Sequence, residues 1–500
     1  MNLSDLIDRN AAFTPEKPAL RFEGGVLTYA AFAARVEAAA RALASELGIR
    51  AGDRIAVLSA NHPDILVLLY ACARLGAVLV PLNWRLAVPE QLFILTDAAA
   101  AALFVEEAFA AVIAPLAEAQ PKMPVVGLDF APSGGSFDRL LAAGTGEGRD
   151  PQADLEAPLL LVYTSGTTGR PKGALLTQEA VFFNGVMSQH MHGLTADDHV
   201  LTVLPLFHVG GLNIQTTPAL HHGATVTLHA RFSAGATLAS IARDRPSLTV
   251  LVPATMQAVI EHPAFADSDL SSLRALTTGS TTVPQGLIDA FEARGVPVLQ
   301  VYGATETCPI AVYTRLGGDR GRPGSTGLPG LACAAKVVTE DGAEAAAGVA
   351  GEILVRGPNV FRGYWGDPDA TRAALDDGWY RSGDVGSRDA DGYVYVHDRK
   401  NNLIISGGEN VYPAEVERVL LAHPAVAEAA VVGRPDPRWQ EVPVAYVVLR
   451  PRASAEAGEL RAHVAGELAR FKVPREVVFV AELPRNAMGK VQHFRLRERG

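Results

Sequence analysis

The residues Tyr163–Gly173, YTSGTTGRPKG, combine three glycines, four serine or threonine hydroxyls and one lysine. Glycines expose backbone N–H groups that form a nest for anions, hydroxyls add donors, and Lys172 adds positive charge. The stretch is not a Walker A loop, because Pro171 precedes the lysine and prevents the loop from running directly into a helix. Its composition therefore predicts a loop that holds phosphates.

Alternating strands and helices must position this loop. Short β-branched runs predict buried strands at Arg54–Ala60, Ala77–Leu82, Leu159–Thr164, His199–Leu206, Leu248–Pro253 and Val296–Gly303. Helices are predicted at Tyr29–Glu46 and at Gln178–Gln189, the second with Thr177 as its N-cap. Alternation of this kind predicts parallel α/β layers in a large N-terminal domain.

The pattern of predicted secondary structure changes twice after this region. From about Gly327, short alternating strands with glycine turns predict a smaller β-rich subdomain. After Asp398–Asn402 comes a C-terminal α+β unit whose helix begins at Pro413 and has an apolar stripe of Val416, Val419 and Leu420. The predicted fold class is thus α/β, with domains at 1–398 and 402–500 and a hinge near 399–402.

The composition limits the protein's environment and partners. The 500 residues carry a formal net charge of −10, which argues against a nucleic-acid-binding protein. The cysteines Cys72, Cys308 and Cys333 have no CxxC spacing, so we expect buried thiols in a reducing compartment. The N-terminus lacks the apolar core of a signal peptide, and Arg74 and Gly76 interrupt the longest apolar stretch. These features predict a cytoplasmic protein with no membrane-spanning segment.

The loop resembles the signature loop of the adenylate-forming enzymes, a superfamily of acyl- and aryl-CoA ligases, peptide-synthetase adenylation domains and luciferases. Four further motifs resemble those of the family and follow in its order along the whole chain: YGATE at Tyr302–Glu306, GWYRSGD at Gly378–Asp384, DRKNNLIISGGENVYP at Asp398–Pro413 and PRNAMGK at Pro484–Lys490. The resemblance implies an enzyme that joins a carboxylate to ATP, releasing pyrophosphate, and then passes the acyl group to a thiol. ATP, Mg²⁺ and coenzyme A are the implied cofactors.

The resemblance also implies roles for individual residues of a nucleotide site. Glu306 would bind Mg²⁺, Thr305 would contact the α-phosphate, and Lys490 would bridge the carboxylate and the α-phosphate. Tyr302 would stack on adenine, and Asp384 would accept the ribose hydroxyls. The other residues assigned to ATP or AMP are Thr164, Ser165, Gly166, Thr167, Thr168, Gly169, Lys172, Gly279, Ser280, Gly303 and Arg399.

Family members rotate a small, mobile C-terminal domain between the two half-reactions. The resemblance places the pivot at Asn401, where many relatives have aspartate or lysine; asparagine tolerates unusual backbone angles, so rotation should survive. The loop Ser406–Asn410 would then form the pantetheine tunnel. The implied CoA-binding residues are Ser406, Gly407, Gly408, Trp439, Phe471, Lys472 and Arg475.

The acid pocket should lie among segments around PLFHVGG, LVPATM and GATETCPI. His208 resembles the residue that gates this pocket in aryl- and fatty-acid ligases, and Gly210 with Gly211 should leave space for a chain or ring. The pocket residues are His208, Val209, Gly210, Gly211, Pro253, Gly303, Cys308 and Pro309. None is cationic, so a second carboxylate would be buried without a partner, which is costly. We expect an apolar monocarboxylic acid, either a medium- or long-chain fatty acid or an aryl acid.

Three other functions compete with an acid–CoA ligase. An acyl-AMP ligase would load a carrier protein, but the chain has no carrier-domain serine motif, and Trp439 with the basic RFKVPR segment favours CoA. A non-catalytic nucleotide-binding protein would not need Lys172, Glu306 and Lys490 together. Luciferase-type oxidation has no separate motif here. A homodimer stays open, since the sequence does not determine the oligomeric state.

Overall fold

The structure is a computed structural model and describes residues 1–132, 134–165, 171–279, 283, 285–318, 321–339, 341–399, 404–411, 413–484, 491 and 493–497. The chain divides into two compact units. Unit 1 comprises Met1–Asn83, Leu95–Val162 and Gly173–His397, and unit 2 comprises Trp84–Ile94, Tyr163–Lys172 and Asp398–Gly500. The predicted hinge residue Asn401 lies outside the described residues.

The first sheet of unit 1 is largely parallel, as the alternation of strands and helices predicted. Its strands follow the order β15 (Leu328–Pro329), β14 (Val312–Tyr313), β13 (Val298–Tyr302), β12 (Ala275–Gly279), β11 (Leu248–Val250), β9 (His199–Thr202), β10 (Thr225–Leu228), β1 (Pro18–Phe22) and β2 (Gly25–Thr28). The ladders from β13 to β1 are parallel, and antiparallel pairs occur at both edges.

A second sheet contains the strands on either side of the predicted phosphate loop. Its order is β18 (Gly363–Tyr364), β8 (Pro171–Thr177), β7 (Pro158–Ser165), β4 (Val78–Pro81), β3 (Arg54–Leu58), β5 (Ala102–Val105) and β6 (Val125–Gly127). The chain enters the loop from β7 and continues after it along β8, which agrees with the prediction that Pro171 prevents the loop from running directly into a helix.

Most predicted strands end earlier than the apolar runs that suggested them. The run His199–Leu206 forms β9 only as far as Thr202. The buried Asn61 side chain explains the difference, because it donates to the carbonyl of Leu204 at 2.9 Å and accepts from the N–H of Leu206 at 2.8 Å. These bonds satisfy backbone groups that a strand ladder would otherwise pair.

The helices begin where the sequence places their caps. Helix α2 (Tyr29–Glu46) has the predicted bounds, and α7 extends from Gln178 to His192, with the Thr177 hydroxyl accepting from the Ala180 N–H at 3.1 Å. The helices before α7 are α1 (Ser4–Phe13), α3 (Pro63–Leu75), α4 (Val88–Asp97), α5 (Ile113–Ala119) and α6 (Phe137–Ala143). Those after it in unit 1 are α8 (Val209–Gly211), α9 (Thr217–His221), α10 (Ala234–Asp244), α11 (Pro253–Ile260), α12 (Gln285–Glu292) and α13 (Pro368–Ala374).

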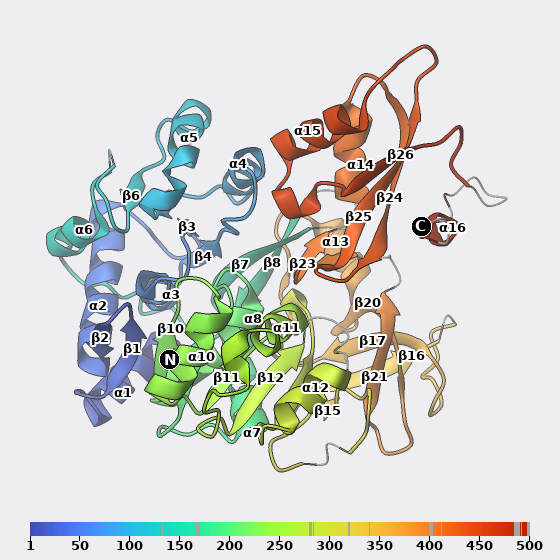
Figure 1. The fold of residues 1–500 in the computed structure, drawn as a ribbon. Coiled ribbons are helices and arrows are strands. Elements are labelled where there is room, and N and C mark those ends of the chain that lie inside the picture. Colours follow the sequence, from blue (N-terminus) through green and yellow to red (C-terminus); the bar gives the residue numbers. More distant parts are fainter. Residues whose placement is uncertain are drawn as a thin grey trace. The chain divides into compact units, whose positions relative to one another are not determined.

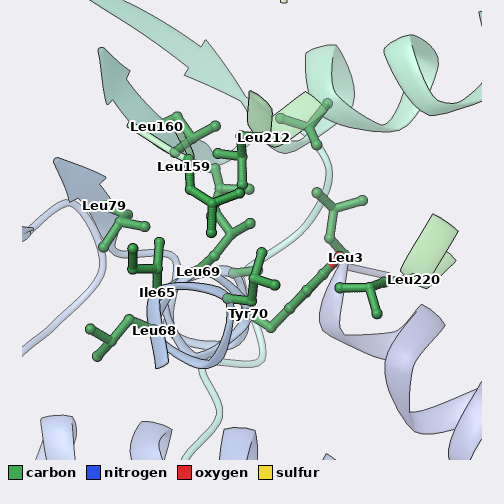
Figure 2. Close-up of a cluster of buried hydrophobic side chains, with 14 of the residues drawn as sticks. Leu3, Ile65, Leu68, Leu69, Tyr70, Leu79, Leu159, Leu160, Leu212 and Leu220 are labelled. Carbon is green, nitrogen blue, oxygen red and sulfur yellow. The ribbon is translucent and has the colours of Figure 1, made fainter. Parts of the chain in front are cut away.

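Helix α3 is enclosed on all sides. All of its residues are buried, as expected for a helix that is apolar around its whole circumference. Figure 2 shows Ile65, Leu68 and Leu69 of α3 near the labelled strand leucines, with Tyr70 toward Leu3 and Leu220. This packing joins the strands next to the phosphate loop to the helices behind them.

The predicted β-rich subdomain forms the end of unit 1. Its antiparallel sheet contains β16 (Ala334–Val338), β17 (Gly351–Arg356), β20 (Trp379–Arg388) and the short β19 (Leu375–Asp376), and β21 (Val394–Arg399) pairs with β20 (Figure 1). The sheet carries the GWYRSGD motif, so the subdomain contributes Asp384 to the candidate site.

The C-terminal part of unit 2 is an α+β structure. Its sheet has β23 (Glu409–Val411), β22 (Ile404–Ser406), β25 (Gln440–Leu449) and β24 (Val426–Asp436), with β26 (Glu476–Phe479) parallel to β25. The helices are α14 (Pro413–Ala422), α15 (Ala457–Glu467) and α16 (His493–Arg497). Val416, Val419 and Leu420 of α14 are buried in the core, which confirms the predicted apolar stripe.

No helix in the described part of the chain combines the length and the apolar character needed to span a membrane.

Candidate functional site

Tyr302 and Asp384 meet although 82 residues separate them in the chain. Tyr302 is the last residue of β13, and Asp384 lies within β20. The Tyr302 hydroxyl donates to Oδ2 of Asp384 at 2.9 Å, and only 4% of Asp384 is exposed. The residues assigned to adenine and ribose are therefore adjacent, each limiting the rotation of the other.

Glu306 lies directly after β13, in the short 3₁₀ helix Thr305–Thr307. Gly303 permits the tight path, because a Cβ there would lie 1.6 Å from the carbonyl oxygen of Pro309. The Asn359 side chain stabilises the segment after Glu306 by donating to the carbonyls of Thr307 and Ile310 at 3.0 and 2.9 Å. Glu306 is 7% exposed, and its Oε1 accepts from the Tyr364 hydroxyl at 2.8 Å.

The base of the phosphate loop is closed by a hydrogen bond. Thr164 at the end of β7 donates through its hydroxyl to the carbonyl of Lys172 at 3.4 Å, and both residues are half-buried. The assigned Gly166, Thr167, Thr168 and Gly169 lie outside the described residues, as do Ser280, Asn401 and Lys490. The side chains of Ser165 and Arg399 are also outside the described part.

The two glycines of the predicted acid pocket differ in their surroundings. They belong to α8, which continues into a π-helical turn at Leu212–Thr216, a conformation frequent at functional sites. A Cβ on Gly210 would have Cδ1 of Ile214, 4.0 Å away, as its nearest neighbour. On Gly211 it would lie 2.2 Å from the Pro205 carbonyl oxygen. The expected space therefore exists at Gly210 and not at Gly211, which allows two backbone segments to approach closely.

The other assigned pocket residues are mostly buried. The rings of Phe207 and His208 have centroids 4.5 Å apart. Pro253 begins α11 and is buried, as are Val209 and Pro309. Cys308 is fully buried beside the Asn213 amide, and burial raises the pKa of its thiol well above the usual range. The three cysteines form no disulfides, which agrees with the sequence analysis.

Gly279 ends β12 and also serves a close approach. A Cβ at this position would lie 2.2 Å from the carbonyl oxygen of Val301 in the neighbouring strand. The absence of a side chain at Gly279 therefore lets β12 and β13 approach closely at this point.

The assigned CoA residues Gly407 and Trp439 are in contact. Gly407 and Gly408 form the turn between β22 and β23 with φ values of 60° and 81°, a conformation that favours glycine. The Gly407 N–H donates to the carbonyl of Trp439 at 2.8 Å, and a Cβ on Gly407 would lie 2.7 Å from Cε3 of the indole. Trp439 is 41% exposed, so an apolar surface lies beside the turn that follows Ser406.

Lys472 does not face solvent as a nucleotide-binding lysine would. It is 2% exposed, and its Nζ donates to Glu90 at 2.7 Å and to Glu415 at 2.8 Å. Burial lowers the pKa of this ammonium, but the two carboxylates outweigh burial and raise it. Arg475, three residues later, is exposed, and Phe471 packs on the core of this unit.

Several residues of these sites were not predicted from the sequence. Tyr364 contacts Glu306 from 58 residues away, and no spacing rule connects them. Glu90, the partner of Lys472, was missed for the same reason. Arg438 lies with its guanidinium 4.9 Å from the centre of the Trp439 ring. The dipeptide Arg438-Trp439, a cation next to an aromatic residue, was the available signal for a further CoA contact.

The family models and the similar proteins agree on one family. The model of the AMP-binding enzyme family matches residues 7–365, and that of the AMP-binding enzyme C-terminal domain matches residues 415–490. The chain is 50% identical to an indoleacetate–CoA ligase of Aromatoleum aromaticum over 500 residues, covering 100% of this chain and 98% of the relative. It is 41% identical to a feruloyl-CoA synthase of an Amycolatopsis species, covering 98% and 97%.

A solved structure agrees with these sequences. The o-succinylbenzoate CoA synthetase of Bacillus subtilis, a double mutant bound with a product analogue, has a TM-score of 0.90 at 35% identity, covering 100% of this chain and 99% of that one. The fold class, the class of enzyme and the use of ATP and coenzyme A that the five motifs predicted are confirmed. The chain therefore belongs to the AMP-binding enzyme family.

Proposed function

We propose that this enzyme activates an aryl-substituted monocarboxylic acid of the indoleacetate or hydroxycinnamate type and transfers the acyl group to coenzyme A. The observation that carries the proposal is the room for a small side chain at Gly210, two residues along the chain from His208, whose ring pairs with that of Phe207, in a chain half identical to a ligase named for indoleacetate. Aromatic rings favour offset or edge-to-face contacts worth about 0.5–1.5 kcal/mol beyond burial, which favours a ring over an alkyl tail.

The nucleotide site is assigned to unit 1 and the phosphate loop. Tyr302 would stack on adenine. Asp384, which accepts a hydrogen bond from the Tyr302 hydroxyl, would accept the ribose hydroxyls. Thr305 would contact the α-phosphate, and the loop from Thr164 to Gly173 with Lys172 would receive the β- and γ-phosphates. Gly279, Ser280 and Gly303 would also contact the nucleotide, and Arg399 would assist at the ribose.

Glu306 suits Mg²⁺ chemically, because Mg²⁺ takes hard oxygen ligands and commonly binds through one carboxylate plus the phosphates of its substrate. The carboxylate is nearly buried and held by a phenol, so it is a preformed ligand. When bound, Mg²⁺ would neutralise part of the triphosphate charge.

The first half-reaction converts the carboxylate, which is a poor electrophile, into an acyl-adenylate, from which AMP is a good leaving group. One oxygen of the substrate carboxylate attacks the α-phosphorus of ATP, and the bond to pyrophosphate breaks. Both reactants are anions, so Lys490 would supply the charge that lets them approach. The second half-reaction forms the thioester bond as the CoA sulfur attacks the carbonyl and AMP leaves.

The CoA site is assigned to unit 2. The turn Ser406–Gly408 with Trp439 offers a narrow apolar surface for pantetheine. Arg475 and Arg438 are exposed, and both lie near enough to Asp436 to lower the pKa of its carboxyl, after the backbone donors that dominate that shift. These two guanidinium groups, with Phe471 nearby, are the proposed contacts of the CoA nucleotide. Asn401 would be the pivot.

Pyrophosphate release across a panel of monocarboxylic acids, with and without CoA, tests the proposal. We expect sustained turnover only with CoA and the highest kcat/KM on indoleacetate or a hydroxycinnamate, ahead of octanoate and decanoate. A maximum on the fatty acids would contradict the aryl assignment. A single burst of pyrophosphate without CoA-driven turnover would instead support the alternative, an acyl-AMP ligase that loads a carrier protein.

A further inference from the structure

A short segment of unit 1 connects Glu306 to the strand that leaves the phosphate loop. Residues Phe361–Trp365, called the brace below, include strand β18, which pairs antiparallel with β8. The brace donates backbone hydrogen bonds from Trp365 to Gly173 at 2.7 Å and from Arg362 to Leu175 at 2.8 Å. Its first residue, Phe361, donates to the carbonyl of Glu306 at 2.8 Å.

Tyr364 adds a side-chain bond to this backbone connection. Its hydroxyl donates to Oε1 of Glu306 at 2.8 Å, while its own N–H donates to the Thr371 hydroxyl at 2.9 Å. Its ring meets Phe361 edge-on at 4.8 Å. The phenol is thus fixed at both its backbone and its ring, and it limits the rotation of the carboxylate.

The brace packs closely against neighbouring side chains at Gly363 and Phe361. Gly363 has a φ of 145°, and a Cβ there would lie 2.7 Å from Cγ2 of Thr371. Phe361 is 3% exposed and also packs edge-on against Tyr380, which lies on the same strand as Asp384. The brace therefore contacts Glu306, strand β8 and strand β20, which carries Asp384.

We propose that Tyr364 is a positioning residue for adenylate formation. Its phenol holds one oxygen of Glu306 so that the other is presented to Mg²⁺, and the brace sets this carboxylate against the strand that leaves the phosphate loop. The inference rests on the proposed role of Glu306 as the Mg²⁺ ligand. Hydrogen-bond donors to a ligating carboxylate commonly change metal affinity by about 10- to 100-fold when removed.

The test measures how strongly Mg²⁺ and ATP binding are coupled. The dissociation constant of ATP is determined by calorimetry with Mg²⁺ and with EDTA, and the ratio of the two gives the coupling. We expect Tyr364→Phe, which keeps the ring and loses the hydroxyl, to reduce this ratio by about 10-fold. Raising the Mg²⁺ concentration should restore pyrophosphate release, and thioester formation from supplied acyl-adenylate should stay unchanged.

Two controls make the result specific. Tyr395→Phe also removes a phenol–carboxylate hydrogen bond in unit 1, to Asp389 at 3.3 Å, and should leave the ratio unchanged. Phe361→Leu weakens the packing of the brace but keeps the phenol, so a ratio reduced equally in this variant would assign the effect to packing and overturn the proposal.

Glu306→Gln separates the failure of this inference from that of the proposed function. If this variant loses the coupling while Tyr364→Phe behaves as the parent enzyme, Glu306 binds the metal and Tyr364 does not position it. If Glu306→Gln retains the coupling, the assignment of Mg²⁺ to Glu306 is wrong, and the inference fails with it.

Discussion

Two adjacent glycines, Gly210 and Gly211, differ because of what lies where a Cβ would stand. At Gly210 the nearest atom is 4.0 Å away, an ordinary van der Waals distance, so a small side chain fits. At Gly211 a backbone oxygen lies at 2.2 Å, so any side chain forces the backbone to move. Of these two glycines, only Gly210 can therefore accept a small side chain without a shift of the backbone.

Gly210→Leu should select against large acids. Filling the space should lower kcat/KM for indoleacetate by about 10- to 100-fold and affect a small acid such as propionate far less, since steric discrimination in apolar pockets is worth about 1–3 kcal/mol. The measurement is pyrophosphate release for each acid. Gly211→Ala is the comparison and should lower the thermal midpoint instead. An equal loss for every acid in Gly210→Leu would refute the pocket assignment.

At the scale of elements, a buried ion cluster connects three segments of unit 2. Lys472 extends from a 3₁₀ turn, Glu415 from α14 and Glu90 from α4. A buried pair contributes little net stability relative to an apolar replacement, but removal of one partner leaves uncompensated charge. The lysine of RFKVPR is then a structural residue, while Arg475 of the same motif stays available to a ligand.

Lys472→Met and Arg475→Ala should therefore have opposite signatures. The first should lower the free energy of unfolding by about 3–5 kcal/mol, because two carboxylates lose their counter-charge. The second should change stability by less than about 0.5 kcal/mol and raise the KM for CoA. Denaturant unfolding and initial rates provide the measurements; a raised KM for CoA in Lys472→Met without lost stability would restore the nucleotide role first expected for Lys472.

The same cluster gives a pH prediction. The folded-state pKa of Lys472 is raised, so its contribution is fully present below the unfolded pKa of about 10.4 and is lost only as pH rises through the still higher folded value. The difference in the free energy of unfolding between the parent and Lys472→Met should thus be constant between about pH 8 and pH 9, and it should narrow at lower pH, where protonation relieves the unpaired carboxylates of the variant.

At the scale of the whole molecule, the assigned chemistry divides between two units. Unit 1 contains Tyr302, Asp384 and Glu306, and unit 2 contains the Gly407–Trp439 contact. In the proposed mechanism both half-reactions involve the same carboxyl group of the substrate, and Lys490 and Trp439, both in unit 2, are assigned to different half-reactions. This division predicts variants that lose one half-reaction and keep the other.

Lys490→Ala should abolish adenylate formation and leave thioester formation from a supplied acyl-adenylate largely intact. Loss of a charge used only where two anions approach lowers the first rate by about 10²- to 10³-fold or more. Trp439→Ala should do the reverse. It is a better probe of the tunnel than Gly408→Leu, because Gly408 has a φ of 81° that strains any other residue. Equal loss of both half-reactions in Lys490→Ala would refute its assigned role.

Features that depend on neighbouring residues could be predicted from the sequence. Pro171 excluded a helix directly after the phosphate loop, Thr177 marked the start of α7, and the apolar stripe of α14 predicted its buried face. Ordered motifs also identified the family. Caps, turns and periodicity act over a few residues, so they can be read directly from the order of the amino acids.

Contacts between groups far apart in the chain could not be predicted from the sequence and are seen only in the fold. The Tyr364 hydroxyl donates to Glu306, and Lys472 forms ion pairs with Glu90 and Glu415. The Asn61 side chain bonds the backbone of Leu204 and Leu206, just after β9. The same lysine could serve a phosphate or a carboxylate, and the same apolar run could be strand or buried loop. Which partner such a group has depends on which segments the fold brings within hydrogen-bonding distance, and the local sequence does not contain that information.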